Sequence, residues 1–192
     1  MEINTEGFII IIVTLIAAYY IYNYYSEYGL IKVKSNIDNN EYTVQIKDDS
    51  LEAANLIATV RERLLVLMEH LEKSYGNDDK RVMLLKKNFR PDRLKEGVTT
   101  PGYTSYSVNK GEQIILCLRN NDELVDINTL FFVVLHEFAH LATESIGHTE
   151  EFWDNFRWIL EESINIGLYI KQDFNIKNVE YCGMSITSSP LD

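Results

Sequence analysis

The segment His136-Glu137-Phe138-Ala139-His140 constrains the fold of this chain more than any other feature. It follows an apolar run at residues 130–135, so a helix here would pass through a core instead of along the surface. Residues four apart share a helix face, so both histidines can direct ring nitrogens at one metal ion. Glu137 lies beside that face, where it can act as a general base without being a ligand. The spacing predicts a core helix with a metal site.

A candidate third ligand follows the motif. Three of the four histidines fall within residues 136–148, and Gly147 offers a helix end at which the chain can turn and bring His148 back. Other third ligands stay open at this point. Glu144 could be this ligand, or it could instead orient a histidine by accepting a hydrogen bond from its ring. Glu161 or Glu162, on the next predicted helix, could also be the third ligand.

Residues 7–25, GFIIIIVTLIAAYYIYNYY, are almost continuously apolar or aromatic. About twenty such residues span a bilayer, and the tyrosines cluster at one end, as rings at the headgroup level do. The six residues before this stretch carry acids instead of basic residues, and no small-residue cleavage site follows it, which disfavours a signal peptide. A buried core helix is the remaining alternative. We predict an N-terminal flank at 1–6 and a single transmembrane anchor at 7–25.

The lysines after this stretch indicate an orientation. Lys32 and Lys34 follow it while acids precede it, so the positive-inside tendency places the remaining domain on the cytoplasmic side. We therefore predict a single-pass membrane protein with a cytoplasmic domain.

The rest of the chain is long enough for one domain with a core. We predict a linker at 26–40, the domain at 41–170, and a tail at 171–192 whose packing on the domain is left open. The predicted elements are a strand at 42–47, a helix capped by Asp49 or Ser50 that runs to Gly76, a hairpin of strands 103–108 and 113–118, the metal helix capped by Asp126 or Asn128, and a helix capped by Thr149 that runs to Gly167. The second hairpin strand could be an edge strand that receives an extended substrate, or an ordinary core strand.

Charge and cysteine content narrow the classes of function. The formal net charge is −11, so the clustered basic residues of a nucleic-acid surface are not indicated. The two cysteines, Cys117 and Cys182, do not indicate a disulfide scaffold, which agrees with a reducing compartment but does not exclude one bridge. Cys182 could cap a metal as an inhibitory thiolate or belong to a buried wall.

Three blocks of sequence, in this order, resemble the WLM metallopeptidases, which are related to the SprT-like (Spartan) proteases. They are residues 107–119 (SVNKGEQIILCLR), the HEFAH segment, and residues 148–153 (HTEEFW). The similarity covers roughly residues 90–160. Two departures stand out: the gap between the second and third histidines is longer than in the members compared, and Thr149 stands where they have an acid.

The resemblance implies an α+β, zincin-like metallopeptidase domain, a small sheet with an active-site helix. It implies His136, His140 and His148 as Zn²⁺ ligands and Glu137 as the catalytic base. The expected function is a membrane-anchored zinc metalloendopeptidase acting on protein or peptide substrates, with Tyr169 and Tyr181 as oxyanion donors by residue type alone. Nucleic acid is a partner by resemblance only, because the charge does not support it. The alternatives are a non-catalytic, membrane-anchored zinc-binding scaffold or partner-recruiting module, and an inhibited protease that awaits a trigger.

Overall fold

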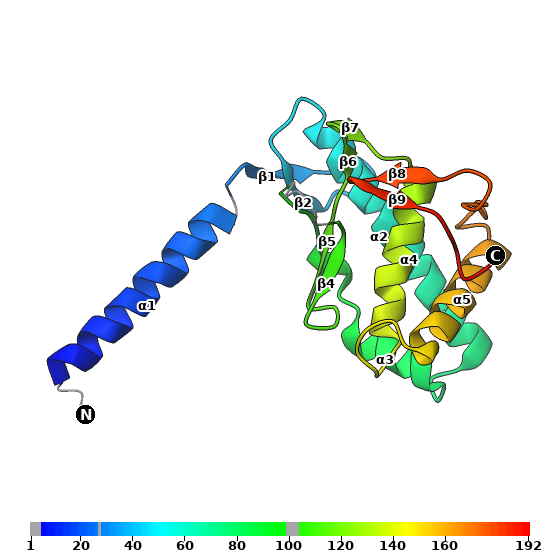
Figure 1. Cartoon of the computed structure of the whole chain (residues 1–192), viewed down its shortest axis with the longest axis horizontal. Coiled ribbons are helices and arrows are strands. Elements are labelled where there is room, and N and C mark those ends of the chain that lie inside the picture. Colours follow the sequence, from blue (N-terminus) through cyan, green and yellow to red (C-terminus); the bar gives the residue numbers. More distant parts are fainter. Residues whose placement is uncertain (1–4, 27, 99–103) are drawn as a thin grey trace.

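Helices and short strands follow one another in separate runs along the chain (Figure 1). The computed structural model describes residues 5–26, 28–98 and 104–192. The elements are α1 (Thr5–Ser26), β1 (Leu30–Lys34), β2 (Glu41–Gln45), α2 (Ser50–Tyr75), α3 (Lys80–Asn88), the 3-10 turn η1 (Pro91–Arg93), β3 (Leu94–Glu96), β4 (Tyr106–Val108), β5 (Gln113–Leu116), β6 (Arg119–Asn120), β7 (Glu123–Leu124), α4 (Ile127–Leu141), α5 (Glu150–Asn165), β8 (Val179–Tyr181) and β9 (Met184–Ile186). The predicted α+β class is confirmed.

The core lies between α2, α4 and α5, with α4 in contact with both other helices (Figure 1). The apolar run before the histidines forms the first turns of α4, and its side chains are buried on most sides of the helix. Asp126 accepts a hydrogen bond from the Asn128 amide at 2.8 Å, which satisfies one of the free N–H groups at the helix start. Of the two predicted caps for α4, Asp126 is therefore correct.

A three-stranded sheet lies beside these helices in the order β3-β5-β4. β5 pairs in parallel with β3 and antiparallel with β4, so it has no free edge and is an ordinary core strand. Of the two predicted roles for this strand, substrate addition is therefore excluded. Among the described residues, β4 is the outermost strand on the hairpin side of this sheet. The start of the predicted first strand, Tyr103, lies outside the described residues.

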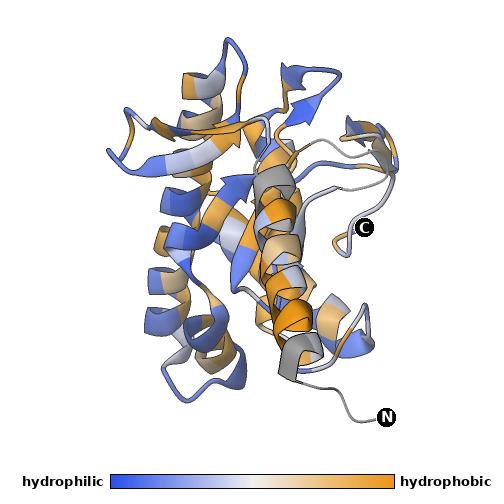
Figure 2. Cartoon of the chain, turned by 90° about the vertical axis from the view of Figure 1, so that its left-hand side faces the viewer, coloured by the Kyte–Doolittle hydropathy of each residue, from blue (hydrophilic) through white to orange (hydrophobic). Residues whose placement is uncertain are grey.

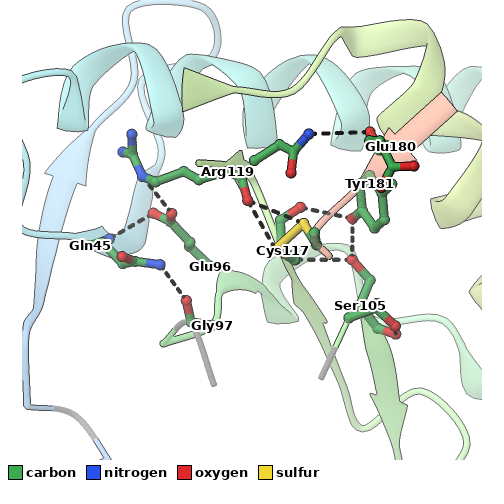
Figure 3. Close-up of a disulfide and its surroundings, with 11 residues drawn as sticks. Gln45, Glu96, Gly97, Ser105, Cys117, Arg119, Glu180 and Tyr181 are labelled. Atoms are coloured by element: carbon green, nitrogen blue, oxygen red, sulfur yellow. Dashed lines mark hydrogen bonds and ion pairs between the residues drawn. A yellow bond between two sulfur atoms is a disulfide. The ribbon is translucent and has the colours of Figure 1, made fainter. Parts of the chain in front are cut away.

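Two corrections concern the start of the domain. β1 lies in the segment predicted as a linker and pairs antiparallel with β2. Asp49 precedes α2, but its side chain makes no capping hydrogen bond. It accepts a hydrogen bond from Arg119 at 2.5 Å instead, and Arg119 also donates to the fully buried Glu96 at 3.0 Å (Figure 3). A buried guanidinium requires acceptors, and this long-range ion pair takes Asp49 away from local capping.

The N-terminal helix α1 is apolar on all sides where its side chains are described, residues 7–21 (Figure 2). Within the described part of the chain, no helix is both long and apolar enough to cross a membrane. The prediction of a transmembrane anchor at residues 7–25 is therefore not supported. The cytoplasmic placement of the domain stays a prediction.

The C-terminal segment is fastened to the sheet. Cys182, in the turn between β8 and β9, forms a disulfide with Cys117, 65 residues earlier (Figure 3). Beside it, the fully buried Tyr181 donates its hydroxyl hydrogen to the Cys117 carbonyl at 2.7 Å. Neither cysteine is free, so the prediction of Cys182 as an inhibitory thiolate is wrong.

Removal of this bridge should destabilise the domain. We expect Cys182→Ser to lower the free energy of unfolding by about 2–4 kcal/mol, because the bridge restricts a long loop of the unfolded chain. Urea denaturation with and without dithiothreitol measures this. Reductant should bring the wild-type transition down to that of Cys182→Ser and leave the variant unchanged. A wild-type transition that reductant does not shift would show that the bridge contributes no stability.

Candidate metal centre

Three imidazole rings converge at the open side of α4. His136 and His140 lie one helical turn apart, and His148 returns to them from the loop between α4 and α5. The ring centroids are 4.9–5.0 Å apart, and the Nε2 atoms of His136 and His148 are separated by 3.0 Å. One nitrogen from each ring lies within 4.8 Å of the others. The structure thus brings together the three histidines predicted as ligands.

A single aromatic ring packs against all three imidazoles. Phe152, in the first turn of α5, is fully buried and lies 4.2–4.9 Å from each histidine ring, centroid to centroid. Thr149 caps this helix by accepting a hydrogen bond from the Phe152 amide at 3.4 Å, as predicted. The third block of sequence therefore supplies one histidine and the ring that packs against it.

Burial keeps two of the rings uncharged. It lowers the pKa of His136 to about 3 and that of His140 to about 4, and the neighbouring rings reinforce both shifts. At neutral pH both imidazoles are therefore neutral, with a nitrogen lone pair available to a metal ion.

Glu137 lies beside the cluster and is 7% exposed. Burial raises its carboxyl pKa to about 7, although hydrogen bonds from the side chain and backbone of Ser107 act in the opposite direction. Ser107 belongs to β4, so the strand beside α4 orients the carboxylate. Sequence reasoning gave Ser107 no role, although it opens the first of the three blocks.

The turn that returns His148 is held by polar side chains from three parts of the chain. The last carbonyls of a helix have no partner within the helix, and here other residues supply one. Asn88 donates to the Leu141 carbonyl, Asn155 to the Ala142 carbonyl and the Thr143 hydroxyl, and Lys110 to the Thr143 and Glu144 carbonyls. Asn155 is 7% exposed and Thr143 is fully buried. Sequence reasoning did not single out Asn88, Lys110 or Asn155.

The acids considered as alternative third ligands have other partners or lie elsewhere. Glu144 pairs with Lys80 at 2.7 Å. Glu162 accepts hydrogen bonds from Tyr75 at 2.6 Å and contacts the His70 ring at 2.5 Å. Glu161 is exposed and, among the described residues, only the three histidines form the cluster. His148 is the third group that the geometry offers.

Neither tyrosine named as an oxyanion donor is available. The hydroxyl hydrogen of Tyr181 is directed at the Cys117 carbonyl, and Ser105 also contacts that hydroxyl at 2.6 Å. Tyr169 packs in the core against Phe132, with ring centroids 5.9 Å apart, and is 2% exposed. Both residue-type predictions are therefore not supported by position.

The chain is similar in sequence to viral proteins. The chain is 33% identical over 164 residues to the uncharacterized protein R325 of Acanthamoeba polyphaga mimivirus, a match that spans 83% of each chain. It belongs to the R325 family. The uncharacterized protein 136R of Invertebrate iridescent virus 6 is 26% identical over 160 residues, which is 78% of this chain and 85% of the relative. No family model matches the sequence.

The structure is similar to crystal structures of Wss1 from Saccharomyces cerevisiae. A mutant form gives a TM-score of 0.49 at 19% identity, over 66% of this chain and 91% of that one. Another crystal structure gives 0.45 at 21% identity, over 64% and 85%. The histidine cluster itself is consistent with the HExxH zincin site that the sequence predicts.

Asn155 should be essential to the turn that carries His148. We expect Asn155→Ala to lower the free energy of unfolding by about 1–3 kcal/mol, because it leaves the buried Ala142 carbonyl without a donor. Asn165→Ala, at an exposed position of the same helix, is the matched control and should change stability by less than about 0.5 kcal/mol. Urea denaturation of both variants decides this. Equal effects would mean that the Asn155 hydrogen bonds do not hold the turn.

Proposed function

We propose that the protein is a zinc-dependent metallopeptidase in which His136, His140 and His148 bind Zn²⁺ and Glu137 is the general base. One observation carries the proposal: three imidazoles converge on one point with a buried carboxylate beside them. His136 and Glu137 also line one cavity, so the site is open to a substrate. The resemblance to the WLM metallopeptidases supports the same assignment.

The residues present fit a zinc ion. Zn²⁺ binds neutral imidazole at about 2.0–2.1 Å, and two tetrahedral ligands of that length lie about 3.3 Å apart. The Nε2 atoms of His136 and His148 lie 3.0 Å apart, close to that separation. Catalytic zinc sites use three protein ligands and leave one position open, whereas structural sites close all four. Three histidines, with no fourth ligand among the described residues, match the catalytic pattern.

The chain's own residues provide the remaining parts of a peptide hydrolysis. When bound, Zn²⁺ would polarise a carbonyl and lower the pKa of a coordinated water to about 7. The Glu137 carboxylate, oriented by Ser107, is positioned to take a proton from the attacking water and to pass it to the leaving amine. Phe152 holds the three imidazoles in place through packing.

Protein or peptide is the substrate class that we propose. The acidic chain, with a net charge of −11, does not favour a polyanionic substrate. A purely structural zinc site is the alternative function, and it gives no use to a buried carboxylate next to the ligands. Glu137 is therefore the residue that distinguishes the two functions.

Metal analysis tests the ligand set. We expect the full chain to bind one Zn²⁺. His136→Ala or His148→Ala should weaken Zn²⁺ binding by more than about 100-fold, because loss of a residue that only hydrogen-bonds to a ligand costs about 10–100-fold. His70→Ala removes the fourth histidine, which lies outside the cluster, and should leave affinity unchanged. Competition with a chromophoric chelator gives the affinities. Equal effects of His70→Ala and His148→Ala would rule out His148 as a ligand.

Replacement of the base tests the chemistry. We expect Glu137→Gln to retain Zn²⁺ and to cut hydrolysis of an unfolded protein by about 10²–10⁴-fold, the usual contribution of a general base. Glu161→Gln, at an exposed position on α5, is the control and should retain activity. Full activity in Glu137→Gln would contradict the mechanism. A zinc-loaded wild-type chain that cleaves nothing would support the non-catalytic scaffold.

A further inference from the structure

One cavity holds both the candidate base and a large apolar surface. It has a volume of about 280 Å³, and His136 and Glu137 line it together with side chains from α4, α5 and the C-terminal segment. We call the apolar part of this cavity the apolar pocket. Its lining residues are Phe132, Val133, Trp153, Phe156, Met184 and Ile186.

The pocket adjoins the reacting groups because of helix geometry. Val133 precedes Glu137 by four residues, so the two share one face of α4 and the apolar wall begins one turn before the base. Phe156 contacts the His136 ring at a centroid distance of 5.2 Å, and Phe132 contacts Phe156 at 5.4 Å. A side chain in this pocket would therefore belong to a residue adjacent to the bond that is attacked.

The opposite wall is preformed by the C-terminal segment. The disulfide at Cys182 and the buried Tyr181 fix the start of the β8–β9 turn, and Arg157 donates to the Pro190 carbonyl at 2.9 Å farther along. Both ends of the segment that carries Met184 and Ile186 are thus attached to the domain. A wall held in this way loses little conformational freedom when it is covered by a ligand.

The chemistry of the lining favours an apolar occupant. Met184 is 50% exposed and Trp153 is 42% exposed, so an occupant would remove apolar surface from water. Glu137 is the one acidic or basic residue among the lining residues, apart from His136. A charged side chain would lose hydration here, and an acidic one would also face Glu137.

We propose that the apolar pocket receives a large apolar side chain, aliphatic or aromatic, from the substrate residue next to the cleaved bond. This specificity rests on the proposed peptidase function and adds to it a substrate class. Met184 and Val133 are the residues that set the preference: Met184 from the C-terminal wall, and Val133 from α4.

Cleavage mapping tests the preference first. The full chain loaded with Zn²⁺ is incubated with an unfolded protein, and the products are sequenced by mass spectrometry. Leu, Ile, Met or Phe should be enriched at one fixed position beside the cleaved bond. Matched peptides with Leu, Ser, Asp or Lys at that position should then differ, with Leu preferred over Asp and Lys by about tenfold or more in kcat/KM. Cleavage that depends on Glu137 but shows no enriched residue at any position would contradict the proposed specificity of the pocket and leave the peptidase function intact.

A charge reversal separates a specificity role from a structural one. Met184→Glu, at a half-exposed position, should lower kcat/KM for the Leu peptide about tenfold and raise it for the Lys peptide by a similar factor. Ile176→Glu places the same charge at an 84% exposed position outside the pocket and should change neither value. A gain for the Lys peptide would support the proposal, because general damage to the protein cannot raise kcat/KM. An equal loss of kcat/KM for all peptides in Met184→Glu would contradict it.

Binding provides a readout that does not need turnover. Glu137→Gln should bind a fluorescent Leu peptide more tightly than the Ser or Asp peptide, and addition of Met184→Glu should reverse the order between Leu and Lys. If no peptide is cleaved, the peptidase function fails. The order of peptide affinities then decides by itself whether the pocket prefers an apolar side chain. Equal affinities for the Leu and Asp peptides would overturn it.

Discussion

The hydrogen bonds that close the C-terminal end of α4 determine whether a metal centre can form. His136 and His140 are brought together by helical periodicity alone, but His148 must return across a turn whose carbonyls lack partners within the helix, including that of the buried Ala142. Asn155 and Lys110 supply donors to that turn from α5 and from the β4–β5 hairpin. The hairpin can come this close because Gly111 has no side chain: a Cβ there would lie 2.6 Å from the Asn88 carbonyl oxygen and 2.8 Å from Leu141. The hairpin and the last helix are thus structural parts of the site.

A second constraint is that α4 must be both a core helix and a polar one. Most of its side chains are buried, including Phe131, Phe138 and Leu141. Polar groups on such a helix are costly unless they face a cavity or have partners. The two histidines share one face and Glu137 lies beside it; Phe152 packs against the rings and Ser107 bonds to the carboxylate. Burial keeps His136 and His140 neutral, and the same burial brings the pKa of Glu137 to about 7.

The parts of the fold and site that follow local rules could be predicted. The i, i+4 spacing of His136 and His140, the caps at Asp126 and Thr149, and the hairpin before α4 all depend on residues close in sequence. The parts that depend on distant partners could not. Asp49 resembled a helix cap, but Arg119, 70 residues away, takes its carboxylate. β5 resembled an edge strand because its neighbour β3 comes earlier in the chain and pairs in parallel. The pairing of Cys117 with Cys182, and the placement of the C-terminal segment in the cavity, have no local signal.

These distant contacts converge on β4 and on Ser105, the residue that precedes it. Residues two apart in an extended segment point to the same side, so Ser105 and Ser107 face the same direction. Ser107 hydrogen-bonds to Glu137. The Ser105 hydroxyl contacts the Tyr181 hydroxyl at 2.6 Å and accepts a hydrogen bond from the Cys117 amide at 2.9 Å. The same few residues therefore orient the candidate base and anchor the wall of the apolar pocket. A substrate residue seated against that wall would lie at a distance from Glu137 that this segment helps to set, because Glu137 bonds to Ser107 and Tyr181, at the start of the wall, bonds to Ser105.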